Sequence, residues 1–284
     1  MSIIMNDIKN YIDFLRNSGF EVSLAVCGDN AIYGDDLPDL YNYSVHNNSV
    51  CSYMKSNGKT GGRCVAAKDR LRKNPPCGAC SSVCYAGVCD FIFPAKSGGK
   101  TVALAIVTGY RVQNEQTKRC VDAISALCGG EYISRFGGLN SNLPDYSALS
   151  AAVTPLLYML ARLYEYARDN AVNCPHEPWY QKSLQYIFDN YMNDIDSAAV
   201  ARYVGYSESY LRRLFREKCG VTIGAFINDV RLQKAAQQLK TTDYSISYIA
   251  ELCGYSDPNY FSYAFGKKYG TSPKSYRKKY RFGS

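Results

Sequence analysis

Six cysteines lie close together in the first third of the chain, and they are the residues there best suited to carry chemistry. They are Cys51, Cys64, Cys77, Cys80, Cys84 and Cys89. The last four are spaced Cys-x2-Cys-x3-Cys-x4-Cys, which is typical of thiolate ligands for zinc or an iron–sulfur cluster. The same thiols could instead form a reversible redox pair or line a small-molecule pocket. The spacing leaves these three interpretations open.

A second set of side chains suited to binding, polar and basic, lies on one face of an expected helix in the C-terminal third of the chain. Leu211, Leu214 and Phe215 are spaced to form the buried face of that helix. The residues left outward are Ser209, Arg212, Arg213 and Arg216. Arginine suits recognition of a DNA base, because its guanidinium group can bond guanine O6 and N7 together.

The usual catalytic arrangements are missing from the sequence, so we do not expect an enzyme. The chain has two histidines and shows neither a Ser/His/Asp set nor a glycine loop that could cradle a phosphate. It also shows no secretion signal and no apolar run of the length that a membrane-spanning helix needs. We therefore expect reduced thiols, a cytoplasmic location and no membrane partner.

The positive charge is concentrated at the C-terminus. Residues 182–284 contain 16 Lys and Arg against 9 Asp and Glu, a net charge of +7, whereas the preceding residues carry a net charge of +1. A length of 284 residues is typical of two domains. A basic domain next to a neutral one indicates that one domain binds a polyanion and the other binds a different partner.

The basic region contains an internal repeat. Gly205-Tyr206-Ser207 recurs as Gly254-Tyr255-Ser256, with matching apolar residues on both sides. Each copy is predicted to fold as helix, glycine turn, helix, with Ser197 and Ser207 as caps in the first copy and Asp257 followed by Pro258 in the second. A helix over 223–240 joins the copies. This is the pattern of two helix-turn-helix motifs whose second helices enter the DNA major groove.

Residues 182–284 resemble the AraC/XylS DNA-binding domain, above all in the stretch IAELCGYSDPNYFSYAFGKKYGTSPKSYR. The resemblance implies seven helices, double-stranded promoter DNA and RNA polymerase as partners, and a role as an activator. It assigns base reading to Ser209, Arg212, Arg213, Asn259, Ser262 and Tyr263. It assigns phosphate binding to Arg216, Lys267, Lys268, Lys274, Lys278 and Lys279. Many members carry Arg or Lys where Tyr263 stands, so we expect weaker base reading by the second motif.

The first half of the chain mixes helical and strand patterns, which predicts an α+β domain. Helices are expected over 1–18, 48–56, 61–73 and 117–127, and strands over 22–27, 87–94 and 101–112. Ser97-Gly98-Gly99 is a hairpin turn signal between the last two strands.

Residues 5–130 resemble the PocR ligand-binding domain. The resemblance rests on the order Cys51, Cys64 and then Cys84-Tyr85-Ala86-Gly87-Val88, followed by a strand that ends in proline and a hairpin. That family is regarded as PAS-like, senses small hydrocarbon derivatives such as diols and is often fused to AraC-type domains. The resemblance implies a small-molecule effector near Cys51, Cys64 and Cys84. A histidine is usual after the motif's cysteine, where this chain has Tyr85.

Residues 147–181 are expected to couple the two domains. Apolar residues there alternate by four and three, which favours either a homodimer seam or a face packed on the sensor's own sheet. They are Leu149, Val153, Leu156, Leu160, Leu163 and Ala167. Pro155 predicts that this helix starts or kinks there. Residues 173–179 form the predicted linker, in which His176 is expected to be solvated.

These observations predict an α+β PAS-like sensor domain (1–146), a coupling or dimerisation segment (147–181) and an all-α DNA-binding domain with two helix-turn-helix motifs (182–284). The predicted function is sequence-specific regulation of transcription in response to a small diol-like metabolite, which requires no cofactor. The alternative is a zinc, iron–sulfur or thiol redox sensor that controls the same DNA-binding domain and uses Cys77, Cys80, Cys84 and Cys89.

Overall fold

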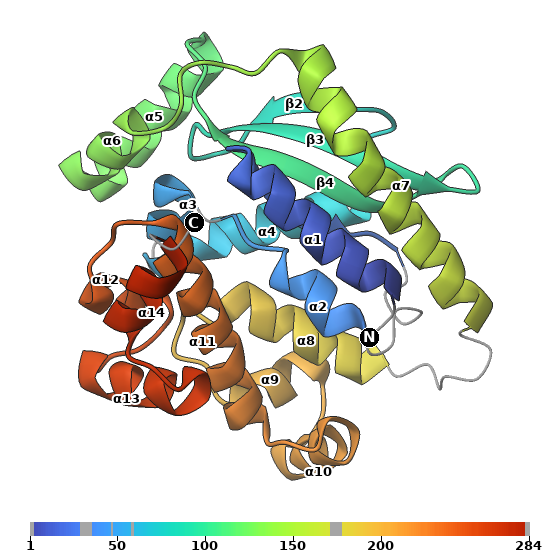
Figure 1. The fold of residues 1–284 in the computed structure, drawn as a ribbon, viewed down its shortest axis with the longest axis vertical. Helices are drawn as coiled ribbons and strands as arrows, with labels where there is room; N and C mark the ends of the chain where they lie inside the picture. The colour runs from blue at the N-terminus through green and yellow to red at the C-terminus, as the bar shows by residue number, and fades with distance from the viewer. Residues whose placement is uncertain (1–2, 29–35, 47, 58–59, 171–177, 282–284) are drawn as a thin grey trace. The chain divides into compact units, whose positions relative to one another are not determined.

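The computed structural model describes residues 3–28, 36–46, 48–57, 60–170 and 178–281, and the chain divides into two units, Met1–Pro178 and Trp179–Ser284 (Figure 1). Within these described ranges, no helix is both long enough and apolar enough to cross a membrane.

A four-stranded antiparallel sheet forms the centre of the first unit. Its strands are β1 (Glu21–Val26), β2 (Cys80–Val83), β3 (Cys89–Ser97) and β4 (Lys100–Tyr110), in the order β1-β4-β3-β2. The predicted hairpin joins β3 to β4, and Gly98 and Gly99 both take positive φ in its tight turn. An α+β unit is therefore confirmed, while its relation to the PAS fold stays a prediction.

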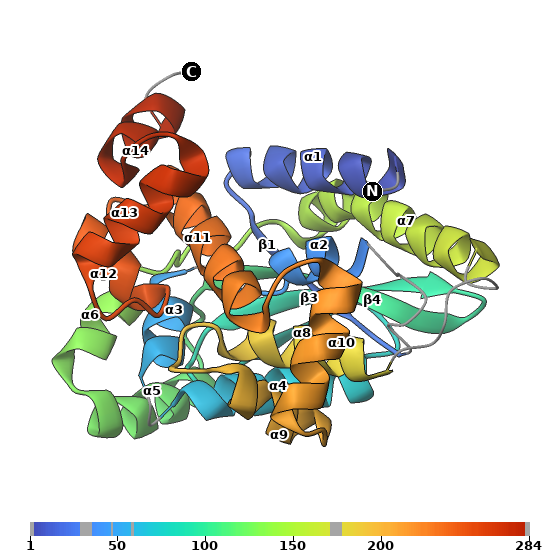
Figure 2. The same ribbon diagram turned by 90° about the horizontal axis from the view of Figure 1, so that it is seen from below.

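Helices cover both faces of this sheet (Figure 2). On one face lie α1 (Ile3–Asn17) and α7 (Tyr146–Asn170), and on the other lie α3 (Ser49–Ser56) and α4 (Gly61–Lys73). Short α2 (Leu37–Asn42) packs against β1, and α5 (Glu115–Cys128) packs against α6 (Gly130–Gly137). Strand β2 and helices α2 and α6 were not predicted, because each is too short to show a hydrophobic period.

The six regularly spaced apolar residues of α7 are buried within the first unit, where this helix packs on β3, β4 and α1. Of the two predicted alternatives, packing on the sensor's own sheet is the one that the structure shows. The prediction that the helix starts at Pro155 is wrong, because it begins at Tyr146 and runs through an exposed Pro155. The apolar face on both sides of the proline outweighs the lost hydrogen bond. Residues 171–177, which include most of the predicted linker and His176, lie outside the described residues.

The described part of the second unit is entirely helical, and its seven helices match the number that the family resemblance implied. They are α8 (Pro178–Asn190), α9 (Ser197–Val204), α10 (Glu208–Cys219), α11 (Ile223–Thr241), α12 (Ile246–Leu252), α13 (Pro258–Tyr269) and α14 (Pro273–Arg281). A core of aliphatic and aromatic residues joins α11 to the last three helices, with Leu239, Phe261 and Phe265 fully buried.

Candidate functional site

Helices α9 and α10 form the first helix-turn-helix motif. Gly205 ends α9 in the left-handed conformation (φ +85°), and the Ser207 side chain caps α10 as predicted. The predicted cap of α9 is wrong, because the carboxylate of Asp196 takes that role and Ser197 is the first helical residue. Aspartate and serine cap helices about equally well, so the sequence pattern could not separate them. The Ser197 hydroxyl donates instead to Glu208 of α10 (2.5 Å), which ties the two helices together.

The outward face of α10 presents guanidinium groups. All four predicted residues on this face are exposed, namely Ser209, Arg212, Arg213 and Arg216. Arg212 donates through Nε to Ser197 Oγ (3.0 Å) and pairs with Glu208 (2.9 Å), so its orientation is set within the motif. Arg213 lies over the ring of Tyr210, with its guanidinium carbon 5.3 Å from the ring centroid. Their side chains are 64% and 63% exposed, so both guanidinium groups can reach a ligand in solvent.

Helices α12 and α13 form the second motif, in which Gly254 makes the turn. A Cβ on Gly254 would lie 2.7 Å from the carbonyl oxygen of Tyr191, so only glycine fits there. Asp257 and Pro258 begin α13 as predicted. The outward residues are Asn259, Ser262 and Tyr263. Ser262 donates its hydroxyl proton to the carbonyl of Pro258 (2.9 Å), whereas Tyr263 is 67% exposed. The second motif therefore offers less hydrogen-bonding capacity than α10.

Lysines surround the second motif on α13 and α14. Lys267, Lys268, Lys274, Lys278 and Lys279 are all exposed, as phosphate binding requires. Lys268 differs from the others, since its ammonium group is paired with the Asp229 carboxylate of α11. This ion pair holds α13 on α11.

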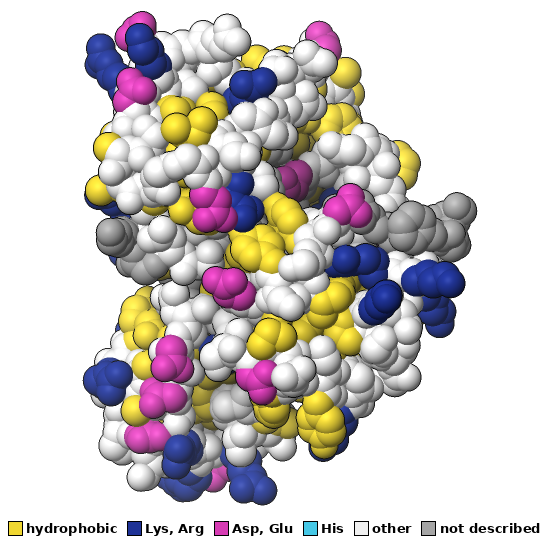
Figure 3. All heavy atoms as spheres, turned by 90° about the vertical axis from the view of Figure 1, so that its left-hand side faces the viewer, with side chains coloured by type: hydrophobic (Ala, Val, Ile, Leu, Met, Phe, Trp, Pro, Cys, Tyr) yellow, Lys and Arg dark blue, Asp and Glu magenta, His cyan; other side chains and the backbone are white. Residues whose placement is uncertain are grey.

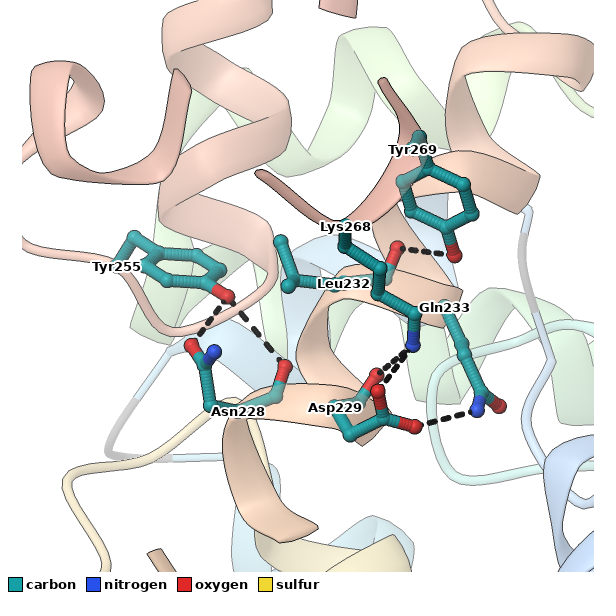
Figure 4. Close-up of polar contacts among 7 residues, drawn as sticks. All are labelled: Asn228, Asp229, Leu232, Gln233, Tyr255, Lys268 and Tyr269. Atoms are coloured by element: carbon teal, nitrogen blue, oxygen red, sulfur yellow. Dashed lines mark hydrogen bonds and ion pairs between the residues drawn. The ribbon is translucent and has the colours of Figure 1, made fainter. Parts of the chain in front are cut away.

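Helix α11 holds both motifs through polar and aromatic contacts. Figure 4 shows the polar ones, which go to the second motif: Tyr255 donates to Asn228 Oδ1 (2.8 Å), Lys268 pairs with Asp229, and Tyr269 donates to the Leu232 carbonyl (3.4 Å). Within α11, Gln233 donates to Asp229 (2.7 Å). Toward the first motif, the ring centroids of Phe226 and Phe215 lie 5.4 Å apart. The two motifs are thus fixed to one rigid helix, as successive major-groove contacts need.

In the first unit, the structure brings together the three cysteines of the predicted effector site, Cys51, Cys64 and Cys84. Cys51 lies in α3, and its sulfur is 3.7 Å from His46 Nδ1. Tyr85 donates its hydroxyl proton to the sulfur of Cys64 (3.4 Å). Cys84 packs on the core that contains Cys51, and the next residue, Tyr85, contacts Cys64, so the three cysteines lie close together. We refer to these three cysteines, His46 and Tyr85 as the cysteine site.

Burial favours the neutral forms of four groups in the cysteine site. It raises the pKa of the Cys51 and Cys84 thiols and of the Tyr85 phenol, and it lowers the pKa of His46. Burial likewise raises the pKa of the nearby Asp90 carboxyl to about 7. Protonated thiols are poor nucleophiles. The arrangement therefore suits an uncharged polar ligand.

The four cysteines of the alternative zinc or iron–sulfur site do not converge. Cys77 is exposed in the segment before β2. Cys80 packs beside Ile92 on the sheet, whereas Cys84 belongs to the separate core of α3, α5 and α6. Across the described ranges, no group of three His, Cys, Asp or Glu side chains is placed to hold a metal ion. These cysteines are close in the sequence but not in the structure. Cys80 lies in β2 and Cys89 in β3, and Cys80 and Cys84 pack on two separate cores.

His46 and Asp90 are site residues that the sequence did not indicate. His46 is outside any cysteine motif, and only the structure shows that its ring lies beside the Cys51 sulfur. Asp90 lies in β3 between apolar residues and accepts a hydrogen bond from Thr108 of β4 (2.5 Å). An isolated carboxylate within an apolar strand was the available signal, since such a group is seldom buried without a partner.

Comparison with known proteins finds similarity in the helix-turn-helix region and, for a bacterial regulator, over nearly the whole chain. Residues 200–279 match a family described as a helix-turn-helix domain. The regulatory protein PocR of Salmonella typhimurium is 26% identical over 97% of this chain and 95% of its own length. The transcriptional activator RhaR of Mannheimia succiniciproducens is 42% identical, over 25% of this chain and 26% of its own.

The xylose operon regulatory protein of Escherichia coli is 38% identical, again over 26% of its own length. The chain thus spans nearly all of PocR but about a quarter of the other two relatives. The DNA-binding domain of AdpA in complex with a target DNA is a similar solved structure, with 25% identity, a TM-score of 0.36 and coverage of 38% of this chain and 96% of that chain. These relatives are regulators and not enzymes.

Proposed function

We propose that this chain, whose C-terminal unit is a helix-turn-helix domain of the AraC/XylS type and whose full length is similar to PocR, activates transcription in response to a small uncharged metabolite. The observation that carries the proposal is the pair of motifs held on α11, each with polar or basic side chains exposed on its second helix. Promoter DNA is then the first partner and RNA polymerase the second.

In this proposal the two motifs share the work unequally. Arg212 and Arg213 of α10 read bases, because their guanidinium forks are exposed and one is already oriented by Ser197 and Glu208. The lysines on α13 and α14 hold phosphates and set the position of the domain. The second motif contributes chiefly affinity, through Asn259 and Tyr263.

Selection of binding sites from a random duplex pool, with the full chain, tests DNA recognition. We expect one recurrent sequence, bound about 1,000-fold or more tighter than a scrambled duplex at the same salt concentration. Enrichment of no sequence above background would refute sequence-specific binding.

We further infer that the cysteine site binds the effector and that the effector is uncharged and carries hydroxyl groups. Thiol, imidazole and phenol groups held neutral by burial can donate and accept hydrogen bonds without the cost of burying a charge. Small 1,2-diols, the ligand class that the PocR resemblance implies, fit this chemistry. The alternative of a metal sensor has less support, because Cys77, Cys80 and Cys84 lie apart and no metal-binding group of three occurs among the described residues.

Thermal unfolding of the full chain with small 1,2-diols tests the effector assignment. A diol should raise the melting temperature of the wild type, and Tyr85→Phe should abolish the increase by removing the hydroxyl beside Cys64. Cys77→Ser is the matched control, because this exposed thiol lies outside the cysteine site. An unchanged diol response in Tyr85→Phe and Cys51→Ser would exclude this site.

A further inference from the structure

A surface pocket of about 860 Å³ lies in the first unit, and no residue of the cysteine site is among those that line it. It is lined by residues 111–114, which follow β4, by the first turns of α5, by Phe136 of α6 and by Ser141 and Leu143. The upper part of Figure 3 shows the face formed by α5 and α6, where apolar side chains lie next to charged ones. A pocket of this size and mixed character is typical of small-molecule sites.

Two buried polar groups of the pocket-lining residues have no hydrogen-bond partner among the described residues. Thr117 is 5% exposed, and its Oγ1 is buried with no hydrogen-bond partner among the described residues. Nε of Arg111 is also buried and also has no hydrogen-bond partner among the described residues. A buried donor left unpaired costs about 1–3 kcal/mol, so in native proteins such a donor is usually paired with protein, ordered water or a ligand.

The local electrostatics at these two groups favour an anion. Thr117 lies in the first turn of α5, where Asn114 caps the helix by accepting from the Thr117 backbone N–H (2.8 Å). The N-terminus of a helix carries a partial positive charge, which adds to the guanidinium charge of Arg111. Lys118 also lines the pocket, and the acidic lining residues, Glu115 and Asp122, are both exposed to solvent.

The rest of the wall is apolar and supplies room for a hydrocarbon tail. Val112, Val121, Phe136 and Leu143 line it. A free phosphate or sulfate would leave these side chains uncovered, whereas an aliphatic carboxylate would cover them. We propose that this pocket binds a small carboxylate with an apolar tail, whose carboxylate group accepts from Arg111 and Thr117.

Residues that line the pocket also contact the core of the cysteine site and the segment that leads into α7. Val121 and Phe136 also pack on the core that contains Cys51, so a bound tail contacts the core of the cysteine site. Arg111 N–H donates to the Asn140 carbonyl (2.9 Å), and the chain from Asn140 leads directly into α7. Binding of the carboxylate is independent of the proposed function, but its action as a second effector rests on it.

Isothermal titration of the full chain with hexanoate tests the pocket. We expect one site per chain and affinity about tenfold weaker in Arg111→Gln and in Thr117→Val. Thr117→Val removes an unpaired hydroxyl, so it should fold at least as stably as the wild type and keep the test valid if Arg111→Gln does not fold. Arg168→Gln, at an exposed arginine of α7 paired with Asp169, is the matched control and should bind as the wild type does.

Two further probes separate charge from tail. Hexanamide keeps the tail without the charge, and sulfate keeps charge without the tail, so both should bind more weakly than hexanoate. Equal binding of hexanamide, equal binding of sulfate, no binding of hexanoate, or full affinity in both variants would each overturn the proposal. Loss of DNA recognition with hexanoate binding intact would count against the proposed function alone.

Discussion

At the scale of single residues, neighbouring arginines of α10 have different surroundings. Arg212 is held by Ser197 and Glu208 of its own motif, whereas Arg213 rests on the ring of Tyr210. We expect Arg213→Ala to cost about 1–3 kcal/mol on the selected site and to relax preference at one base position. Lys278→Ala should weaken binding to all duplexes alike and reduce the salt slope by about 1. Binding constants across a salt series measure both, and equal losses on every sequence from Arg213→Ala would show that it reads no base.

A buried carboxyl makes a second residue-scale prediction. Burial raises the pKa of Asp90 from an ordinary value near 4 to about 7 in the folded protein. Between these values the folded state binds more protons than the unfolded state, so stability falls as pH rises from 4 to 7 and then levels off. Asp90→Asn keeps an acceptor for Thr108 and removes this penalty. It should gain roughly 4 kcal/mol at pH 8 and little at pH 4, as measured by urea unfolding at each pH. An equal effect at both pH values would contradict it.

At the scale of elements, the repeat places equivalent glycines in different surroundings. Gly205 and Gly254 both take positive φ, but a Cβ would meet open space at Gly205 and the Tyr191 carbonyl oxygen at Gly254. Gly205→Ala should therefore cost about 1 kcal/mol of left-handed strain. Gly254→Ala should cost that amount and about 1–3 kcal/mol more, because the backbone must shift. Equilibrium unfolding of the full chain measures both, and equal losses would mean that the second turn relaxes freely.

The elements also show how far sequence reasoning reaches. The repeat, the Gly205 turn, the Ser207 and Asp257 caps and the β3–β4 hairpin follow from local rules, and the structure has each of them. The cysteine site was predicted only in part, because His46 and Asp90 join it through tertiary contacts that no spacing encodes. The seam of α7 was ambiguous for a related reason, since a heptad pattern specifies a buried face but not its partner.

At the scale of the whole molecule, regulation requires that effector and DNA binding be linked through one conformational equilibrium. An effector can shift that equilibrium only by its difference in affinity between two states. If a diol tightens promoter binding, then promoter DNA must tighten diol binding by the same factor, which for coupled sites is about 5- to 150-fold. We expect both factors to agree when diol affinity is titrated with and without the selected duplex, and DNA affinity with and without saturating diol. Tyr85→Phe should bring both factors to one while leaving diol-free DNA affinity intact, since that side chain belongs to the cysteine site and not to the DNA-binding unit. A diol that binds tightly yet leaves DNA affinity unchanged would show that the two units are energetically independent for binding.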